Sequence, residues 1–450
     1  MITTHTHTHR RMKINRSLGL AIGLLLATVA SIAACGQSTL STGHLRLATT
    51  APANETLYVL SGTSDSAGGQ RIVAIHPEVA GGSPVNLPLG LATQDHQRIY
   101  VATPNGAQTT IAILDTQTGT PVRTFSISGR YATDSYDYGE ATLTPDGRWL
   151  ALRQVGQTEG EQSTIALVDT QAGKVARMIQ LSGDFAIDAL SPDGSVLYLL
   201  QNLHDVQHHY YVRAYDIGVG KLLDQIIVDK SEIDHPQMQG SAVARRMGNN
   251  GAAAFTLYVD PLRDTAFVHI LPLDSSGNIT PFARCVDDLP ASTSTELLRG
   301  YTLALSSDGA TLYAVNAALG VASRITTSDG GVLSAHVDAT SHFEPMGSVS
   351  GAIGAAGILS NGAALSADGA TLYVASARGL QVIRTSDMKP LGTYLQGHAL
   401  TGVALSANSK LLYVADAQQG ILLLSSDGSQ WEQLTINGTQ SLQGIAWVDH

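Results

Sequence analysis

The stretch "LSADGATLYVAS" at residues 365–376 closely repeats "LSSDGATLYAVN" at residues 305–316. The same build recurs in four further places: "LATQDHQRIYVA" (91–102), "LTPDGRWLALR" (143–153), "LSPDGSVLYLL" (190–200) and "LSANSKLLYVA" (405–415). Shorter copies without the Asp turn, "TLYVL" (56–60) and "TLYVD" (256–260), bring the number of units to eight. A recurring unit of roughly 40 to 60 residues indicates an architecture built from internal repeats.

The chemistry of the repeated phrase predicts a β-hairpin. In Ser191-Pro192-Asp193-Gly194, proline presets a turn dihedral, the Asp side chain can bond its own backbone, and glycine can adopt positive φ. The runs that follow are apolar on both faces, as expected for a sheet that is covered on each side. We therefore interpret these Asp residues as turn formers, and no D-x-[DN]-x-[DN]-G calcium loop occurs.

A second hairpin follows the first in each unit. Examples are "ILDTQTGTPVRTF" (113–125) and "LVDTQAGKVARMI" (167–179), where a polar turn containing glycine separates two further strands. A unit is thus expected to be a blade of four antiparallel strands, a to d. The predicted fold class is all-β: a single β-propeller of eight four-stranded blades, or seven if one unit is an insertion.

The two ends of the repeat region predict how the ring closes. The last segment, "LQGIAWV" (442–448), matches the innermost strand "LTGVALS" (400–406) but has no second strand after it, whereas the region begins with a second strand at 56–60. The C-terminal strand is expected to join the N-terminal blade and remove a free sheet edge. Gly402 and Gly444 recur at one place in these strands, where inner backbones would crowd toward the axis.

The recurring "LSPDG", "LYVA" and "DTQTG"-like segments resemble the YVTN repeat family of β-propellers over about residues 55 to 449. "YVAT", "YAVN", "YVAS" and "YVAD" stand where that family has Tyr-Val-Thr-Asn. The resemblance implies a propeller scaffold and does not by itself specify a function.

The N-terminal region has the order of a secretory signal peptide. Basic residues precede an apolar stretch at 18–30 that is too short for a membrane span, and "SIAAC" (31–35) closes it with small residues. Residues 32–35 resemble the lipobox of bacterial lipoproteins, which implies cleavage before Cys35 and acylation of that cysteine. The alternative is an ordinary secreted protein.

The resulting domain organisation has three parts. We expect a lipoprotein signal peptide at 1–34, the lipidated Cys35 with a flexible tether at 35–54, and the propeller at 55–450. The protein would then be an extracytoplasmic, membrane-anchored bacterial lipoprotein at the cell surface or the periplasmic face, with the membrane as a partner through its lipid anchor.

Composition excludes some classes of partner. The formal net charge is −11, from 37 acidic and 26 basic side chains, so no basic stripe is available for nucleic acid. Only two cysteines occur, Cys35 and Cys285, which argues against a disulfide framework. We expect a monomer that does not bind nucleic acid.

Loop lengths separate the two rims of the predicted ring. The a–b and c–d turns are short, and the long connections fall almost wholly between b and c or between d and the next a: 61–70, 129–137, 155–162, 201–209, 229–238, 284–298 and 337–360. Both classes emerge on one rim, where binding groups are expected to concentrate. The plain alternative is that this rim merely tolerates insertions.

The candidate ligand-binding residues come from those loops. They are Asp134, Asp137, His204, His208, His209, Asp234, His235, Asp287, Asp288, His342 and Glu344. A zinc or copper site is physically possible among the histidines of 204–209 with Asp234 and His235, and a divalent metal is the one cofactor considered. The acidic members could form a negative mouth for cations, although polar loop residues are the plainer interpretation.

Two functional classes remain open. The favoured one is a binding or protein-interaction scaffold for an unknown protein or small-molecule ligand. The alternative is an extracytoplasmic propeller enzyme, lactonase-like or a metal-assisted hydrolase. Neither G-x-S-x-G nor H-E-x-x-H occurs, so no catalytic residue can be named from the sequence.

Overall fold

The computed structural model describes residues 51–52, 54–62, 70–77, 83–133, 139–156, 162–203, 209–248, 251–328, 331–347, 361–434 and 442–449. All of them belong to one compact unit, Thr42–His450. The predicted signal peptide, Cys35 and most of the tether lie outside the described residues. Within the described part, no helix is long and apolar enough to span a membrane.

The described strands form eight four-stranded blades. Six separate sheets have four strands each, and one nine-stranded sheet contains two blades, which gives eight. In order from inner to outer strand, blades 1 to 4 are β33 (Leu442–Asp449), β1 (Thr56–Ser61), β2 (Arg71–Ile75), β3 (Val85–Pro88); β4 (Leu91–Ala92), β5 (Arg98–Asn105), β6 (Gln108–Asp115), β7 (Pro121–Ser128); β8 (Ala141–Leu143), β9 (Trp149–Arg153), β10 (Gln162–Asp169), β11 (Lys174–Ser182); and β12 (Phe185–Leu190), β13 (Val196–Asn202), β14 (His209–Asp216), β15 (Lys221–Asp229).

The second half of the ring follows the same plan. In the same order, blades 5 to 8 are β17 (Ser241–Met247), β18 (Ala253–Asp260), β19 (Thr265–Pro272), β20 (Phe282–Val286); β21 (Tyr301–Leu305), β22 (Thr311–Asn316), β23 (Val321–Thr327), β24 (Ala335–His342); β25 (Ala363–Leu365), β26 (Thr371–Ser376), β27 (Gly379–Arg384), β28 (Lys389–Tyr394); and β29 (Leu400–Leu405), β30 (Leu411–Asp416), β31 (Gly420–Ser425), β32 (Trp431–Leu434). The sequence prediction of an all-β, eight-bladed propeller is confirmed.

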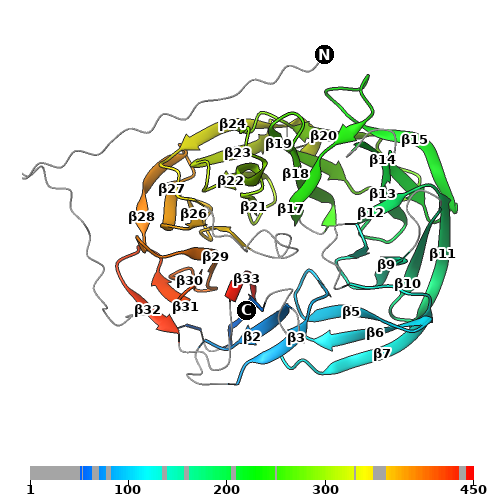
Figure 1. The fold of residues 1–450 in the computed structure, drawn as a ribbon, viewed down its shortest axis with the longest axis horizontal. Coiled ribbons are helices and arrows are strands. Elements are labelled where there is room, and N and C mark those ends of the chain that lie inside the picture. Colours follow the sequence, from blue (N-terminus) through cyan, green and yellow to red (C-terminus); the bar gives the residue numbers. More distant parts are fainter. Residues whose placement is uncertain are drawn as a thin grey trace, which may run out of the picture. The chain divides into compact units, whose positions relative to one another are not determined.

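The blades surround a common axis, with strands such as β12, β17, β21, β29 and β33 inside and β7, β11, β15 and β28 outside (Figure 1). Apolar clusters fill the spaces between neighbouring blades; one of them joins Leu257 and Val268 of blade 5 to Leu303 and Ala314 of blade 6. Middle strands read as apolar on both faces because each sheet is covered by a neighbour on either side.

The ring closes as predicted, because β33 pairs antiparallel with β1 and supplies the inner strand of blade 1. Ile445 is fully buried at this seam. The neighbouring inner strands crowd at glycines: a Cβ on Gly402 would lie 2.8 Å from the backbone nitrogen of Ile445. The predicted crowding toward the axis is therefore confirmed at Gly402.

Blades 4 and 5 are joined in a way that the repeat pattern did not predict. Their outer strands, β15 and β20, pair in parallel through Val228↔Phe282 and Asp229↔Ala283. A short strand, β16 (Met238–Gln239), also adds to β14. The only helical elements described are α1 (Thr295–Leu298) and the 3₁₀ turn η2 (Val332–Ser334).

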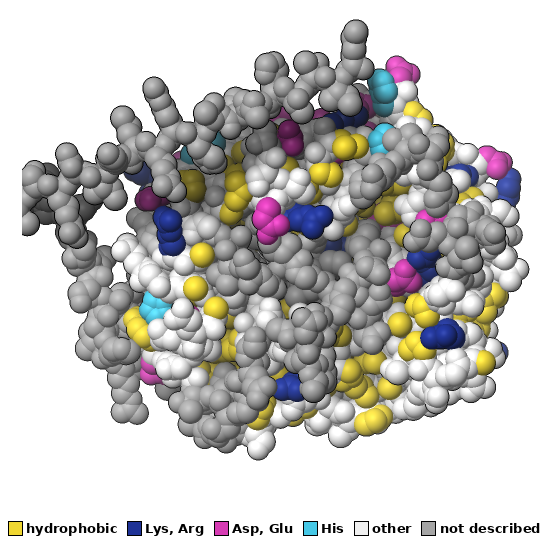
Figure 2. Space-filling view, in the orientation of Figure 1, with side chains coloured by type: hydrophobic (Ala, Val, Ile, Leu, Met, Phe, Trp, Pro, Cys, Tyr) yellow, Lys and Arg dark blue, Asp and Glu magenta, His cyan; other side chains and the backbone are white. Residues whose placement is uncertain are grey.

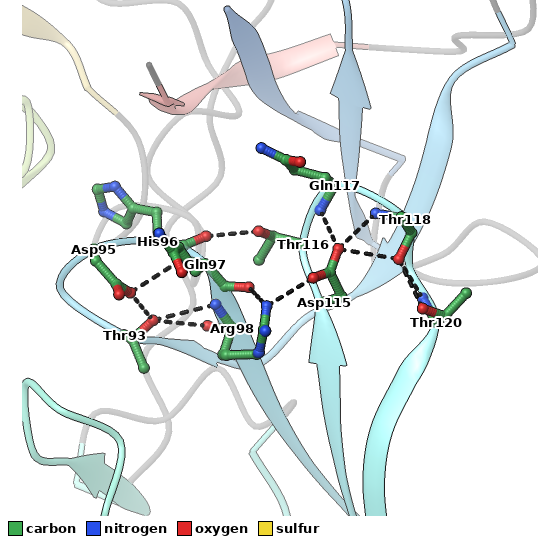
Figure 3. Close-up of polar contacts among 10 residues, drawn as sticks. All are labelled: Thr93, Asp95, His96, Gln97, Arg98, Asp115, Thr116, Gln117, Thr118 and Thr120. Atoms are coloured by element: carbon green, nitrogen blue, oxygen red, sulfur yellow. Dashed lines mark hydrogen bonds and ion pairs between the residues drawn. The ribbon is translucent and has the colours of Figure 1, made fainter. Parts of the chain in front are cut away.

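The repeated phrase is scaffold, as its chemistry predicted. In blade 2 the Thr93 hydroxyl donates to the Asp95 carboxylate at 2.5 Å, and the backbone N–H of Gln97 donates to the same carboxylate at 3.1 Å (Figure 3). Asp115 plays the same part in the c–d turn, where it accepts the N–H of Thr118 at 3.0 Å and pairs with Arg98 at 2.7 Å (Figure 3). Further a–b turns repeat the Ser/Thr–Asp bond: Thr144–Asp146, Ser191–Asp193, Ser306–Asp308 and Ser366–Asp368.

The tyrosine of the phrase links blade 4 to blade 5 and blade 7 to blade 8. Tyr198 of blade 4 accepts the N–H of Asp274 of blade 5 at 2.8 Å, and Tyr373 of blade 7 donates to the carbonyl of Ser426 of blade 8 at 3.1 Å. Each of these bonds reaches a c–d turn on the neighbouring blade. The same twelve residues therefore contain both the residues that form the turn and the tyrosine that bonds to the neighbouring blade.

One turn carboxylate should leave a signature in acid. Burial raises the pKa of Asp193, but hydrogen bonds from Ser191, Ser195 and Ser275 outweigh it and lower the pKa to about 2. Because the folded-state pKa lies below the unfolded value, this contribution is present above pH 3.8 and is lost as the pH falls toward 2. After discounting for solvent screening we expect at most about 1 kcal/mol. The free energy of unfolding, measured in urea, should fall less steeply across this pH window for Asp193→Asn than for the wild type. Equal slopes would contradict the assignment.

Some expected loop boundaries are wrong. Residues 284–286 belong to β20 and residues 337–342 to β24, so Cys285 lies in a strand and His342 ends one. These polar segments pair with the preceding strand, as in His269↔Cys285 and Val321↔His342. Tertiary pairing overrides their loop-like composition, because a half-exposed outer strand tolerates polar side chains.

Candidate functional site

The two rims of the ring use polar side chains differently. One rim carries the short a–b and c–d turns and is called here the short-turn rim; the other carries the b–c and d–a connections and is called the long-loop rim. On the short-turn rim, the Asp carboxylates are engaged by their own turns. The candidate residues from the sequence lie on the long-loop rim wherever the structure describes them.

Seven of the candidates are described. Asp234, His235, Asp287, Asp288, His342 and Glu344 are exposed, and His209 is partly buried at the start of β14. Cys35, Asp134, Asp137, His204 and His208 lie outside the described residues. The lipidation of Cys35 and the ligand-binding role of the candidates remain predictions.

The described candidates do not converge on one point. His209 Nδ1 lies 3.4 Å from Gln237 Oε1, Gln237 donates to the Tyr211 hydroxyl at 3.3 Å, and Glu344 lies 3.8 Å from Arg378. No group of three His, Cys, Asp or Glu side chains within the described ranges is placed to hold a metal ion. The proposed zinc or copper set is not tested, since His204 and His208 are not described.

Two buried carboxylates hold the loops of blades 4 and 5 from below. Asp229 accepts both the N–H and the hydroxyl of Ser231 at 2.9 Å. Asp260, which is 2% exposed, accepts the N–H of Leu262 at 2.9 Å and a side-chain hydrogen bond from Gln239. The loop tips above these carboxylates therefore have fixed anchor points.

A row of polar side chains crosses blade 5 beneath these loops. Register pairs Arg245 with Thr256, Thr256 with His269, and His269 with Cys285, so the four share one face of the blade. Arg245 reaches Asp188 of blade 4, with a nitrogen–oxygen distance of 3.4 Å to its carboxylate. Burial raises the pKa of the Cys285 thiol, and the charge of Asp229 adds to the effect, which makes the thiol a poor nucleophile.

His269 should make stability depend on pH. Burial lowers its pKa below 6.5, Asp188 and Asp229 oppose this, and Nε2 has no hydrogen-bond partner among the described residues. The unfolded state therefore takes up the proton first, and stability is lost as the pH falls below 6.5. His269→Gln should flatten the dependence of the unfolding free energy on pH between about 7.5 and 5.5, whereas the exposed control His235→Gln should not. Identical pH profiles for all three proteins would contradict this role.

The structure also shows a histidine–carboxylate contact that the sequence reasoning missed. His398 Nδ1 lies 2.8 Å from Asp416 Oδ2, and Asp416 Oδ1 accepts the N–H groups of Gln418 and Gln419. The pair lies on the long-loop rim of blade 8. A signal was present, because Asp416 stands in "YVAD" where the preceding repeat has Ser376 in "YVAS".

A second missed network joins blades 3 and 4 on the same rim. Arg153 lies 2.7 Å from Glu140 and 2.9 Å from Asp184, and Asn202 donates to Asp184 at 3.0 Å. These side chains bond to one another across the two blades, and we interpret the network as a link between blades. Among the described residues on the face shown in Figure 2, acidic and basic side chains lie interspersed, without a broad patch of either sign.

Comparison with known proteins adds little to this geometry. No family model matches the chain, and no curated protein matches its sequence. Among solved structures, a candidate 6-phosphogluconolactonase from Bacteroides fragilis is 15% identical with a TM-score of 0.44, and the match covers 88% of this chain and 97% of that one. A β-propeller domain of Cps50 (Swd1) from Myceliophteria thermophila is 13% identical with a TM-score of 0.39, covering 74% and 94%. Likenesses this distant carry no argument about activity or ligand.

Proposed function

We propose that the chain is a YVTN-type propeller lipoprotein of the bacterial cell envelope that binds a protein or small-molecule ligand through its long-loop rim. One observation carries the proposal. The side chains of Asp234, His235, Asp287, Asp288 and His342 are exposed on that rim and make no hydrogen bond or ion pair within the described residues. Polar groups left without internal partners on a rigid scaffold are available to a ligand.

The position of Glu55 supports a defined orientation. Its carboxylate accepts bonds from Ser406 at 2.7 Å and from the N–H of Ala407 at 2.6 Å, both in the a–b turn of blade 8. The chain therefore enters the ring at the short-turn rim. A tether from an acylated Cys35 would then hold the long-loop rim away from the membrane, where a ligand can reach it.

Membrane attachment is tested by Cys35→Ser. The variant should appear in the soluble fraction or remain as an uncleaved precursor, because the thiol that carries the lipid is gone. The measurement is detergent-phase partitioning of cell fractions. Unchanged partitioning of the variant would contradict the anchor.

The binding rim is tested by photo-crosslinking in cells. A photoreactive amino acid at His235, Asp288 or His342 should give discrete adducts, whereas the same amino acid at Gln117 on the short-turn rim should not. Equal adducts from the two rims would contradict a rim-specific binding function.

One feature favours the second candidate, an extracytoplasmic hydrolase. Where His398 Nδ1 donates to Asp416, the bond would orient the imidazole and leave Nε2 as the ring nitrogen that could accept a proton. Purified protein should then hydrolyse members of a panel of lactones and esters, and His398→Asn should abolish that activity without lowering the melting temperature by more than a few degrees. Activity that survives the substitution would exclude this pair as the base.

A further inference from the structure

Among the described residues of the long-loop rim, the large apolar side chains that are exposed lie in one sector of the ring. Ile233, Leu262 and Leu297 are 59%, 69% and 37% exposed, and all three lie in connections of blades 4 and 5. The other large hydrophobic residues exposed in the described part of the chain lie on strands or on the short-turn rim: Val122, Met178, Val219, Met247 and Leu391. An apolar set that gathers on one sector of a rim is typical of an interaction site.

The loops that carry these side chains adjoin one another. Arg284, beside the third loop, contacts Ser231 in the first. Gln239, at the end of the first loop, bonds Asp260 at the start of the second. The N–H of Ser292 in the third loop donates to the carbonyl of Asp264 in the second at 3.2 Å. We call residues 230–237, 261–264 and 287–299 together the blade 4–5 platform.

The platform is held in place before any partner arrives. Asp229 and Asp260, 8% and 2% exposed, anchor its first two loops through the bonds described above. The parallel pairing of β15 with β20 fixes the two blades to each other directly beneath it. Because little loop ordering remains to be done, binding there loses less conformational entropy than binding to a mobile loop.

The charge of the platform is net negative. Its exposed acids outnumber its exposed bases: Glu232, Asp234, Asp287, Asp288 and Glu296 against Lys230, Arg263 and Arg299. One of the bases, Arg263, already lies 3.8 Å from the carboxylate of Asp260. A complementary surface would therefore carry positive charge around an apolar centre.

We propose that the blade 4–5 platform docks a protein partner through a segment in which apolar side chains are flanked by lysine or arginine. Ile233 and Leu262 make the apolar contacts, and Asp287 and Asp288 pair with the flanking cations. This inference rests on the proposed binding function and names the class of partner for it.

The test uses the full-length protein in a zwitterionic detergent and a synthetic peptide in which two leucines are flanked by lysines. Binding is followed by fluorescence anisotropy, with binding to empty micelles subtracted. We expect Ile233→Ser with Leu262→Ser to weaken the complex by about tenfold. We expect Asp287→Asn with Asp288→Asn to weaken it about threefold and to reduce its dependence on salt. The matched control, Val122→Ser with Val219→Ser, should bind as the wild type does.

Other outcomes would overturn the proposal in distinguishable ways. Equal binding of a peptide with serine in place of leucine, or glutamate in place of lysine, would remove its chemical basis. Loss of binding through His342→Ala and Glu344→Ala, but not through the platform variants, would place the site elsewhere on the rim and leave the binding function standing. Binding that no rim variant changes would count against both. A dimer that becomes a monomer with Ile233→Ser and Leu262→Ser would identify a second copy of this chain as the occupant.

Discussion

Deleting residues 441–450 is expected to abolish cooperative folding of the ring. The deletion removes β33, the inner strand of blade 1, and leaves the edge of β1 unpaired. Leu442, Ile445 and Trp447 are 8%, 0% and 7% exposed, and burial of each such side chain contributes about 1.5 to 3 kcal/mol. Their sum is comparable to the whole stability of a typical domain, about 5 to 15 kcal/mol.

The measurement is thermal unfolding followed by circular dichroism. A peptide of residues 441–450 added in trans should restore the transition, and the same peptide with Ile445→Asp should not, because the aspartate would be buried without a partner. A truncated protein that melts within a few degrees of the full chain would show that the seam is not required.

Glu55→Ala should be the most damaging single substitution at the seam. The buried carboxylate, 1% exposed, accepts hydrogen bonds from the Ser406 and Tyr413 hydroxyls and from the N–H of Ala407. Removing it breaks the bonds that the buried hydroxyls of Ser406 and Tyr413 make to the carboxylate, which should lower the free energy of unfolding by about 3 to 5 kcal/mol.

A double-mutant cycle separates this effect from general damage. Tyr413→Phe should cost less in the Glu55→Ala background than in the wild type, because the bond between the phenol and the carboxylate is already absent there. Asn408→Ala, in the same turn, is the matched control and should cost much less. Additive losses for Glu55→Ala and Tyr413→Phe in urea unfolding would contradict the shared bond.

The sequence predicted the blades because their instructions are local. The Asp-Gly turn, the apolar run and the tyrosine lie within twelve residues. The segment "LQGIAWV" is similar to the inner strand "LTGVALS", and this similarity predicts that it is an inner strand too. The pairing of β15 with β20 could not be found in this way, because it joins outer strands of different repeats and needs no turn residue. Parallel pairing of this kind is decided by packing between blades.

The candidate site was less predictable, because side chains meet across loops of different blades. The sequence indicated a candidate site in the histidine-rich segment 204–209. The closest histidine–carboxylate contact in the described ranges instead joins His398 and Asp416, which are eighteen residues apart. The anchors Asp229 and Asp260 look like ordinary loop acids in the sequence. Their burial under the blade 4–5 platform becomes visible only in the fold.

The tyrosine links between blades have a consequence for fragments of the chain. Blades 4 and 7 each offer a tyrosine hydroxyl to a turn of the next blade, as in the bond between Tyr373 and Ser426, and at the seam Tyr413 bonds Glu55 instead. Head-to-tail contacts of this kind also build rings from separate subunits. A fragment cut between two such blades would carry a tyrosine hydroxyl at one end and a receiving turn at the other. Two complementary fragments should therefore reassemble into a closed ring, whereas a single fragment should polymerise.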